Sequence, residues 1–412
     1  MKSLKLVCVG GGTGLSSLLK GFKRFSMINP DAANIINIDE LSAIVTVSDD
    51  GGSTGRLVDE FDVLPPGDIR KLLVSLSESD KLVSSLFEYR FSSDGPLGGH
   101  NIGNLLLIAL TELNDNNFPR AIELASQLLA VRGQIIPVSL QPTILCAELI
   151  DGEIIRGESM IPERKNRSPI QKVFLESRPN GKTSEKYEVK AHKASVDSIN
   201  NADVIIIGPG SLYTSIMPNL VYPEIREALR NSSAIKVYIC NVMSQPGETD
   251  NYSVTEHVNA ITSHANISLD YVIVNDGIAS PEVLKNYIQK KISGQLDLIR
   301  KYTDEGLTMS NNQEDDLTTN PPMDFFDHIS TLSEQISQLS SGITQIANTS
   351  QVQVLFDPQK DHLGGAELVT ADMIYQTRVL VDQGIELDVV RHDPIKLATT
   401  LVGVIGDHFD FS

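Results

Sequence analysis

The chain has 412 residues, of which 41% are hydrophobic, and this is enough material for one large domain with an appendage. Its formal net charge of -19 disfavours nucleic acids and other polyanions, although backbone amides and a few local cations can still hold a small phosphorylated ligand. No apolar run reaches the length of a membrane span and the first residues lack the pattern of a secretory leader, so we expect no membrane insertion and a cytoplasmic location.

The first predicted unit is a strand, a glycine-rich turn and a helix. Residues 6–9 are apolar and lead into Gly10-Gly11-Gly12-Thr13-Gly14, which is followed by the apolar helix start Leu15–Leu19. Glycines let backbone N–H groups approach a ligand, and the N-terminus of the following helix favours an anion. The spacing matches neither a Walker A motif nor a clean GxGxxG fingerprint, so an ordinary strand–helix turn is the alternative to a phosphate-binding loop.

A second unit of this kind covers residues 42–57. Residues 42–47 are mostly β-branched and predict a buried strand, which runs into Asp49-Asp50-Gly51-Gly52-Ser53-Thr54-Gly55-Arg56. The two carboxylates can hold Mg²⁺ or accept a hydrogen bond from a ligand hydroxyl, and Arg56 can face a phosphate. A plain loop with a helix-capping aspartate is the alternative.

Two further turns precede predicted helices. After Pro65-Pro66-Gly67, Asp68 is predicted to cap a helix whose first turn contains Arg70 and Lys71, where the helix dipole disfavours cations. His100 and Asn101 precede the apolar helix 105–110 and serve either as its cap or as ligand-binding groups.

The rest of the chain first departs from the strand–helix pattern and then returns to it. Residues 134–196 contain short alternating runs with a hairpin signal at Asp151-Gly152, which predicts a small antiparallel excursion. Apolar strands are then predicted at 202–207, 236–240 and 271–274, and the turns that follow them carry glycine, amide, hydroxyl or carboxylate groups. The pattern predicts an α/β fold with a Rossmann-like, doubly wound and mainly parallel sheet, whose strand ends line one ligand crevice.

Residues 301–350 form a predicted polar insertion between 1–300 and 351–412, which together make the nucleotide-binding domain. Within the insertion a heptad-like seam predicts an amphipathic helix: Ile329, Leu332, Ile336, Leu339, Ile343 and Ile346. A helix packed on the body and a self-associating coiled coil are both open. We predict a further strand at 351–356 and the start of the last helix within 389–398.

Taken together, the loop sequences resemble the gluconeogenesis-factor family, whose members are YvcK-like proteins related to the CofD-like 2-phospho-L-lactate transferases. The matching stretches are GGGTGLSSLLKGFK, VTVSDDGGSTGRL, LPPGDIRKLL, GGHNIGNLLL, ADVIIIGPGSLYTSIMPNL, CNVMSQPGETDNY and RHDPIKLA. The resemblance implies a Rossmann-like core, a homodimer and a nucleotide or nucleotide sugar in the crevice. The insertion is longer and more polar than this family usually has.

The resemblance also implies roles for individual residues. A phosphate- or nucleotide-binding role falls on the glycine, hydroxyl, amide and arginine positions of the loops: Gly11, Gly12, Thr13, Gly14, Ser53, Thr54, Arg56, Asn101, Asn104, Gly208, Gly210, Ser211 and Asn241. Asp50 is also the candidate Mg²⁺ ligand, and Asp49 and Asp50 would be the catalytic pair if the protein is an enzyme. No other cofactor is predicted.

Two functions therefore remain open at this stage. The first is a cytoplasmic regulator that binds a UDP-sugar such as UDP-N-acetylglucosamine and acts in carbon metabolism, cell-wall synthesis and cell shape. It is favoured because no histidine stands next to a serine or cysteine in any motif, which leaves no obvious nucleophile–base pair. The second is a transferase that moves a phospholactyl group from a GDP-linked donor to a deazaflavin, with Mg²⁺ held against the diphosphate.

Overall fold

The computed structural model describes residues 3–29, 35–92, 95–178, 187–288, 352–381 and 385–410, together with residues 303, 330, 331 and 333. Two compact units are present. One comprises Met1–Gly277, Leu355–Tyr375 and Arg391–Ser412, and the other comprises Ile278–Val354 and Gln376–Val390. The predicted domain boundaries at 300 and 351 and the predicted heptad helix lie outside the described residues and stay predictions.

The first unit is built on a seven-stranded parallel sheet with the order β10-β9-β8-β7-β1-β2-β3. Its strands are β1 (Leu6–Gly10), β2 (Leu41–Val45), β3 (Gln134–Pro137), β7 (Val204–Ile207), β8 (Ile235–Ile239), β9 (Tyr271–Asn275) and β10 (Glu367–Ala371). Every residue of β1, β7 and β8 is buried, as expected for parallel strands that helices cover on both faces. The predicted doubly wound, mainly parallel fold is confirmed.

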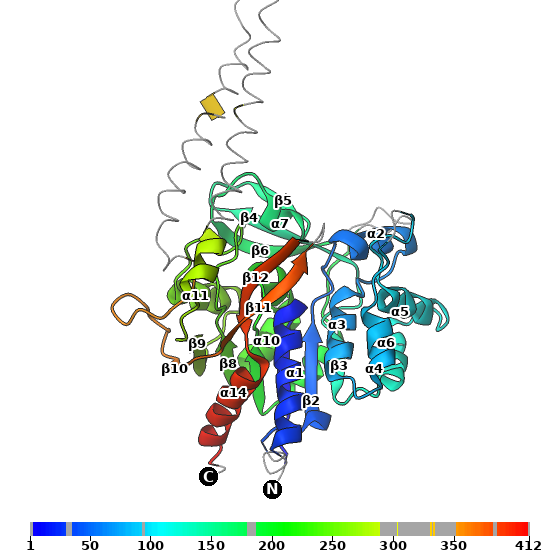
Figure 1. Ribbon diagram of the computed structural model, residues 1–412, viewed down its shortest axis with the longest axis horizontal. Coiled ribbons are helices and arrows are strands. Elements are labelled where there is room, and N and C mark those ends of the chain that lie inside the picture. The colour runs from blue at the N-terminus through cyan, green and yellow to red at the C-terminus, as the bar shows by residue number, and fades with distance from the viewer. Residues whose placement is uncertain are drawn as a thin grey trace, which may run out of the picture. The chain divides into compact units, whose positions relative to one another are not determined.

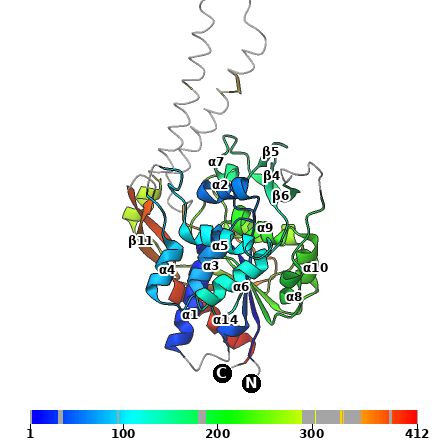
Figure 2. The same cartoon turned by 90° about the vertical axis from the view of Figure 1, so that its right-hand side faces the viewer.

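Helices cover both faces of this sheet. Helix α1 (Gly12–Ile28) packs beside α14 (Pro394–His408) on one face, and α8 (Lys193–Asn200) packs beside α10 (Pro223–Asn231) on the other (Figures 1 and 2). Further α-helices of the first unit are α2 (Gly52–Phe61), α3 (Gly67–Leu76), α4 (Lys81–Glu88), α5 (Ile102–Glu112), α6 (Phe118–Leu128), α7 (Met160–Glu163), α9 (Met217–Leu220) and α11 (Val254–Ala265). None of the described helices is long and apolar enough to span a membrane.

The predicted antiparallel excursion is present but smaller than expected. It is a three-stranded sheet with the order β5-β4-β6, formed by β4 (Thr143–Leu149), β5 (Ile154–Arg156) and β6 (Ile170–Ser177). Residues 134–137, which we assigned to it, instead form β3 and pair in parallel with β2. A short alternating run does not predict which strand it will pair with. Here helices α3 to α6 bring the chain back to the edge of the parallel sheet, where β3 pairs with β2.

One of two predictions near the C-terminus needs correction. In the described residues 352–356 of the strand predicted at 351–356, only residue 353 is assigned a bridge, and the next strand is β10. The last helix, α14, starts at Pro394, within the predicted range 389–398, and the residues just before it end a two-stranded sheet of β11 (Ile374–Val381) and β12 (Ile385–His392). Asp393 caps it by accepting hydrogen bonds from the backbone N–H groups of Ile395 and Lys396.

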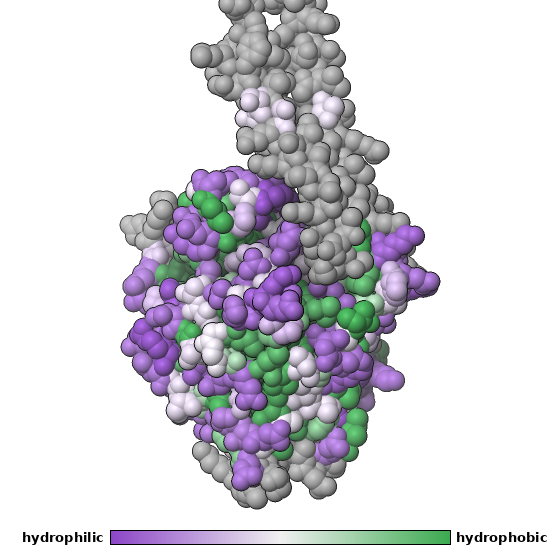
Figure 3. All heavy atoms as spheres, turned by 90° about the vertical axis from the view of Figure 1, so that its left-hand side faces the viewer, coloured by the Kyte–Doolittle hydropathy of each residue, from purple (hydrophilic) through white to green (hydrophobic). Residues whose placement is uncertain are grey.

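The β10 edge of the sheet is open on one side. β10 pairs with β9 and with no other described strand, and its Leu368 and Val369 are half-buried. Figure 3 shows the molecule from this side, where hydrophobic residues gather in the middle of the face and hydrophilic residues surround them. An edge with unpaired backbone groups is a place where another chain can add to a sheet.

The crossing of α1 and α14 gives a test of the packing. A Cβ at Gly21 on α1 would overlap the carbonyl group of Pro394 and lie 3.3 Å from the Cβ of Ala398, so only glycine fits there. We expect Gly21→Ala to lower the free energy of unfolding by about 2 kcal/mol, because α14 must shift outward. Urea unfolding followed by circular dichroism measures this.

Gly403 on α14 is the matched control. It is exposed and a Cβ there would meet nothing within 4 Å, so Gly403→Ala should raise stability by about 0.5–1 kcal/mol through helix propensity. Equal effects of the two substitutions would show that the α1–α14 contact does not constrain this position.

Candidate functional site

The glycine turns after β1 and β7 lie against each other at the carboxyl edge of the sheet. A Cβ on Gly14 would overlap the carbonyl group of Pro209, and one on Gly210 would lie 3.4 Å from the carbonyl oxygen of Gly11. Gly208 adopts a φ of +85°, which favours glycine. The two turns that the sequence singles out are therefore brought together by the backbone itself.

The loop after β8 supports the loop after β7 through amide side chains. The Gln245 amide donates to the Ser211 hydroxyl (2.6 Å) and accepts from the Leu212 backbone N–H (3.3 Å). Asn241 accepts from the backbone N–H of Gly210 (3.4 Å) and donates to Gln245 (3.2 Å). Ser211 and Asn241, predicted as ligand groups, are thus joined through Gln245, which the sequence analysis did not single out.

Asp50 connects the turn after β2 to the small antiparallel sheet. Its carboxylate accepts hydrogen bonds from the backbone N–H groups of Glu158 (2.9 Å) and Ser159 (2.8 Å). Nearby, the buried Arg164 donates to the carbonyl oxygens of Ile161 (2.6 Å) and of Gly247 in the β8 loop. These bonds hold the small sheet over the strand ends and use both oxygens of Asp50.

Asp68 does not act as the predicted helix cap. Helix α3 has no side-chain cap, and the Asp68 carboxylate instead accepts from the backbone N–H of Gly12 (2.7 Å) at the start of α1 and from Lys71 (2.8 Å). The N-terminus of helix α1 attracts negative charge, which favours the contact between the Asp68 carboxylate and the Gly12 N–H group. The carboxylate thus occupies a position where an external anion could otherwise bind. The Arg70–Lys71 pair flagged in the sequence is accounted for locally, since Arg70 donates to Asn104 (2.9 Å).

Acidic side chains gather at this edge of the sheet. Burial and the neighbouring Asp68 raise the pKa of Asp49. Burial, followed by repulsion from Asp49, Asp50, Glu248 and Asp68, raises the pKa of Glu158 to about 8. Burial also raises the pKa of Glu248, to about 7. The ionised forms of several carboxyl groups at the strand-end crevice are therefore disfavoured, and these groups hold protons more readily than free carboxyl groups do.

This donor set fits a divalent cation that is shared with a ligand. Within the described residues no three His, Cys, Asp or Glu side chains are arranged as a complete metal site. Mg²⁺, however, is commonly held by one or two carboxylates together with substrate phosphates and water. Asp49, Asp50 and Asp68 all accept hydrogen bonds already, so hydrogen bonding does not single out one of them as the metal ligand. The tentative assignment of Mg²⁺ to Asp50 stays untested.

The turn before α5 is held by residues that were predicted to bind the nucleotide. Asn101 caps α5 by accepting from the backbone N–H of Asn104 (3.2 Å), and both side chains are buried. The Arg56 guanidinium donates to the carbonyl oxygen of Gly98 (2.9 Å). In the described structure these groups order the turn, and their roles toward a ligand stay predictions.

The structure also brings together a pair that the sequence analysis did not predict. The hydroxyl of Ser53, in the first turn of α2, lies 3.0 Å from Nδ1 of His100. Burial and the nearby Arg56 lower the pKa of His100, which favours the neutral ring. No motif in the sequence places a histidine next to a serine, and this pair forms only because the tertiary fold brings residues 53 and 100 together.

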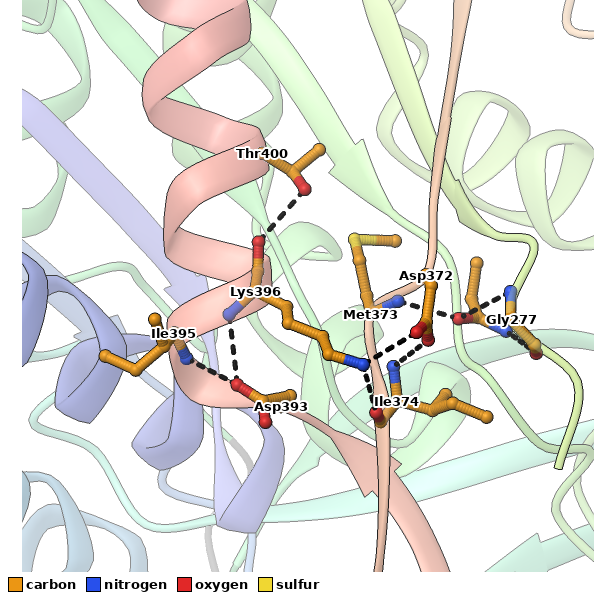
Figure 4. A network of polar contacts seen from close by, with 9 residues as sticks. Gly277, Asp372, Met373, Ile374, Asp393, Ile395, Lys396 and Thr400 are labelled. Atoms are coloured by element: carbon orange, nitrogen blue, oxygen red, sulfur yellow. Dashed lines mark hydrogen bonds and ion pairs between the residues drawn. The ribbon is translucent and has the colours of Figure 1, made fainter. Parts of the chain in front are cut away.

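A separate polar network lies beyond β9 and β10. Lys396 donates to Asp372 (2.7 Å) and to the carbonyl oxygen of Ile374 (3.1 Å), and this ion pair lowers the pKa of Asp372 (Figure 4). Asp372 also blocks the Cβ position of Gly277. The network joins the turn after β9, the β10–β11 link and the start of α14, so its cation is already engaged.

Two cavities of the first unit differ in their relation to this edge. One of about 260 Å³ is lined by Ser48, Asp49 and Asp50 and opens beside the strand-end loops. A larger groove of about 770 Å³ runs along β6 and is lined by Tyr222 and His264, away from the glycine turns. Size alone would select the groove, but the convergent polar groups lie at the smaller cavity.

Three functional candidates were missed in the sequence. Asp68 was assigned only to a cap, and Glu158 follows a hairpin with no motif of its own. Glu248 lies within the quoted stretch CNVMSQPGETDNY, but nothing in its spacing shows that it accepts from Thr214 (3.1 Å) across the crevice. Their proximity arises from long-range packing of the small sheet on the strand ends.

Comparisons with known proteins point to one family. The family model described as 2-phospho-L-lactate transferase CofD matches residues 6–313. A gluconeogenesis factor of Halalkalibacterium halodurans is 44% identical over 292 residues, which cover 71% of this chain and 83% of that protein. The gluconeogenesis factor of Bacillus subtilis is 43% identical over 284 residues, which cover 69% and 82% of the two chains. In a relative from Clostridium acetobutylicum, 41% identical over 293 residues, the match spans only 60% of the protein.

Solved structures agree with the fold. A crystal structure of a Bacillus halodurans protein superposes with a TM-score of 0.69 and 33% identity, over 98% of this chain and 99% of that one. A second crystal structure, described as a member of the upf0052 family, gives a TM-score of 0.69 and 34% identity over 98% and 100% of the two chains.

The raised pKa of Glu158 predicts a pH-dependent stability. Its ordinary pKa of 4.5 applies to the unfolded chain and about 8 to the folded chain, so between these values the folded state holds one more proton. Stability contributed by the protonated group is therefore lost as the pH rises through this window. Glu158→Gln should be more stable than the unmutated protein by about 2 kcal/mol at pH 9, with a difference that shrinks toward pH 5.

Urea unfolding at pH 5, 7 and 9 measures this difference. Glu163→Gln, at an exposed position five residues away, is the control and should show no such trend. A stability difference for Glu158→Gln that is constant with pH would contradict the assigned charge repulsion.

Proposed function

The chain belongs to the CofD family, among relatives named gluconeogenesis factors, and on that premise we propose that it is a cytoplasmic regulator that binds a nucleotide sugar of the UDP class. The observation that carries the proposal is the meeting of two glycine turns and an uncompensated group of carboxylates at one edge of a parallel sheet. Open α/β sheets bind phosphorylated ligands at this edge. In line with the resemblance of its loop sequences, the protein would act in carbon metabolism, cell-wall synthesis and cell shape.

A divalent cation would make the charge of the site compatible with a diphosphate. The Gly12 N–H group is occupied by Asp68, and Lys71 is paired with the same carboxylate, so these groups alone do not neutralise an incoming diphosphate. A cation between Asp49, Asp68 and the diphosphate would offset both the raised pKa of Asp49 and the ligand charge. The glycine turns would then supply close backbone approach to the phosphate oxygens.

A homodimer fits the same proposal. The open edge of β10 and the hydrophobic residues in the middle of the face in Figure 3 provide a surface on which a second copy can pack. Sedimentation of the purified full chain tests this directly.

Calorimetric titration tests the ligand and the cation together. We expect UDP-N-acetylglucosamine to bind without being consumed, and Mg²⁺ to strengthen binding at least tenfold, because the cation relieves repulsion between the carboxylates and the diphosphate. Asp49→Asn and Asp68→Asn should each reduce the Mg²⁺ effect severalfold. Asp39→Asn, an exposed aspartate that pairs with Arg132 before β2, is the matched control and should bind normally.

The outcome separates the possible ligands. Preference for GDP over UDP, or binding that ignores Mg²⁺ and both site variants, would refute the proposed ligand class. Turnover of the nucleotide sugar by the purified protein would refute the regulatory role.

The second candidate is a transferase of the phospholactyl type, which the description of the family model names. The contact between Ser53 and the neutral His100 favours it, since a neutral imidazole beside a hydroxyl can accept its proton. Transfer from a GDP-linked phospholactate to a deazaflavin, abolished in His100→Gln, would support it. If the purified protein shows no transfer of the phospholactyl group in this assay, the transferase candidate is rejected and the nucleotide-sugar-binding role is retained.

A further inference from the structure

The cavity of about 260 Å³ beside Asp49 and Asp50 has one polar end and apolar walls. The end of β2, helix α2 and the loop before α3 form one side of it, and the small antiparallel sheet forms the other. Its apolar lining comes from these elements: Val47, Val58, Val63, Pro65, Pro142 and Ile144. The hydrogen bonds from the backbone N–H groups of Glu158 and Ser159 to the Asp50 carboxylate hold the two sides together.

The charges around this cavity select against an anionic occupant. Its two arginines are already neutralised, since Arg156 forms two 3.1 Å bonds with Glu176 and Arg178 pairs with Asp59. The polar end presents the carboxylates of Asp49 and Asp50, whose oxygens accept backbone hydrogen bonds from Gly51, Glu158 and Ser159 and keep further lone pairs for ligand hydroxyl groups. A negatively charged group would be repelled there, whereas hydroxyl groups would find acceptors.

The size of the cavity limits the occupant further. At roughly 30 Å³ for each water molecule in the liquid, the cavity holds the equivalent of about nine waters, which is room for one hexose but not for a nucleoside diphosphate. We infer that it binds the neutral hexose of a nucleotide sugar, with hydroxyl groups toward Asp49 and Asp50 and the apolar ring face or an acyl substituent against Ile144 and Val63. This inference rests on the proposed function, because the diphosphate is placed at the adjoining glycine turns.

A ligand series on the unmutated protein tests the charge argument. Calorimetry with UDP, UDP-glucose and UDP-glucuronate in the presence of Mg²⁺ separates the contribution of the nucleotide from that of the sugar. We expect UDP-glucose to bind at least tenfold more tightly than UDP, and UDP-glucuronate at least tenfold more weakly than UDP-glucose. Equal binding of the two sugar nucleotides would overturn the inference.

A cavity-filling variant tests the location. Ile144→Phe places extra volume into the cavity, so it should weaken UDP-glucose about tenfold and leave UDP unchanged. Ile154→Phe is the matched control on the same small sheet, because Ile154 is 39% exposed and does not line the cavity. Thermal unfolding of both variants verifies that they fold.

The failures can be told apart. If UDP binds and the sugar adds nothing, or if Ile144→Phe weakens UDP and UDP-glucose equally, the cavity is not the sugar site and the nucleotide proposal stands. If the unmutated protein binds neither UDP nor the UDP-sugars, the proposed function fails and this inference fails with it.

Discussion

The hydrogen bonds from the Asp50 carboxylate to the backbone N–H groups of Glu158 and Ser159 are the interaction on which the candidate site depends. They fix a small antiparallel sheet above the carboxyl ends of a parallel sheet, and so convert an open edge into a bounded crevice. Charge-assisted hydrogen bonds of this kind are about twice as strong as neutral ones, and losing the acceptor would leave two N–H groups unsatisfied. Asp50 thus supports the site structurally, and its role toward a ligand stays a prediction.

This contact of Asp50 with the small sheet creates an electrostatic problem that the protein leaves in place. It brings Glu158 toward Asp49, Asp68 and Glu248, and burial prevents water from screening their repulsion. A fold selected only for stability would replace one of these carboxylates by an amide. Their presence together with raised pKa values is typical of sites that hold a cation or a proton for function.

The sequence predicts the parallel core because its signals are local. Strands β1, β7 and β8 are predominantly apolar runs, and the turns after β1 and β7 can be predicted from their high glycine content. The assignment of residues 134–137 failed because a short apolar run does not say which partner strand it meets, and in the described residues 352–356 the same kind of run forms no strand. For the candidate site, the sequence predicts which loops take part but not the role of each residue in them. Whether Asp68 caps its own helix or reaches Gly12 on another depends on contacts 56 residues apart.

The same charges bear on which chemistry the crevice can serve. A phospholactyl group carries negative charge on both its phosphate and its carboxylate, whereas Lys71 beside the crevice is already paired with Asp68. One divalent cation would offset about half of the combined charge of a diphosphate and two aspartates, so a second anionic group beside Asp49 would add to the remaining repulsion. A neutral sugar next to the diphosphate adds hydroxyl donors where acceptors are in excess and adds no charge. Electrostatics therefore favours a nucleotide sugar over a phosphorylated hydroxy acid in this member of the family.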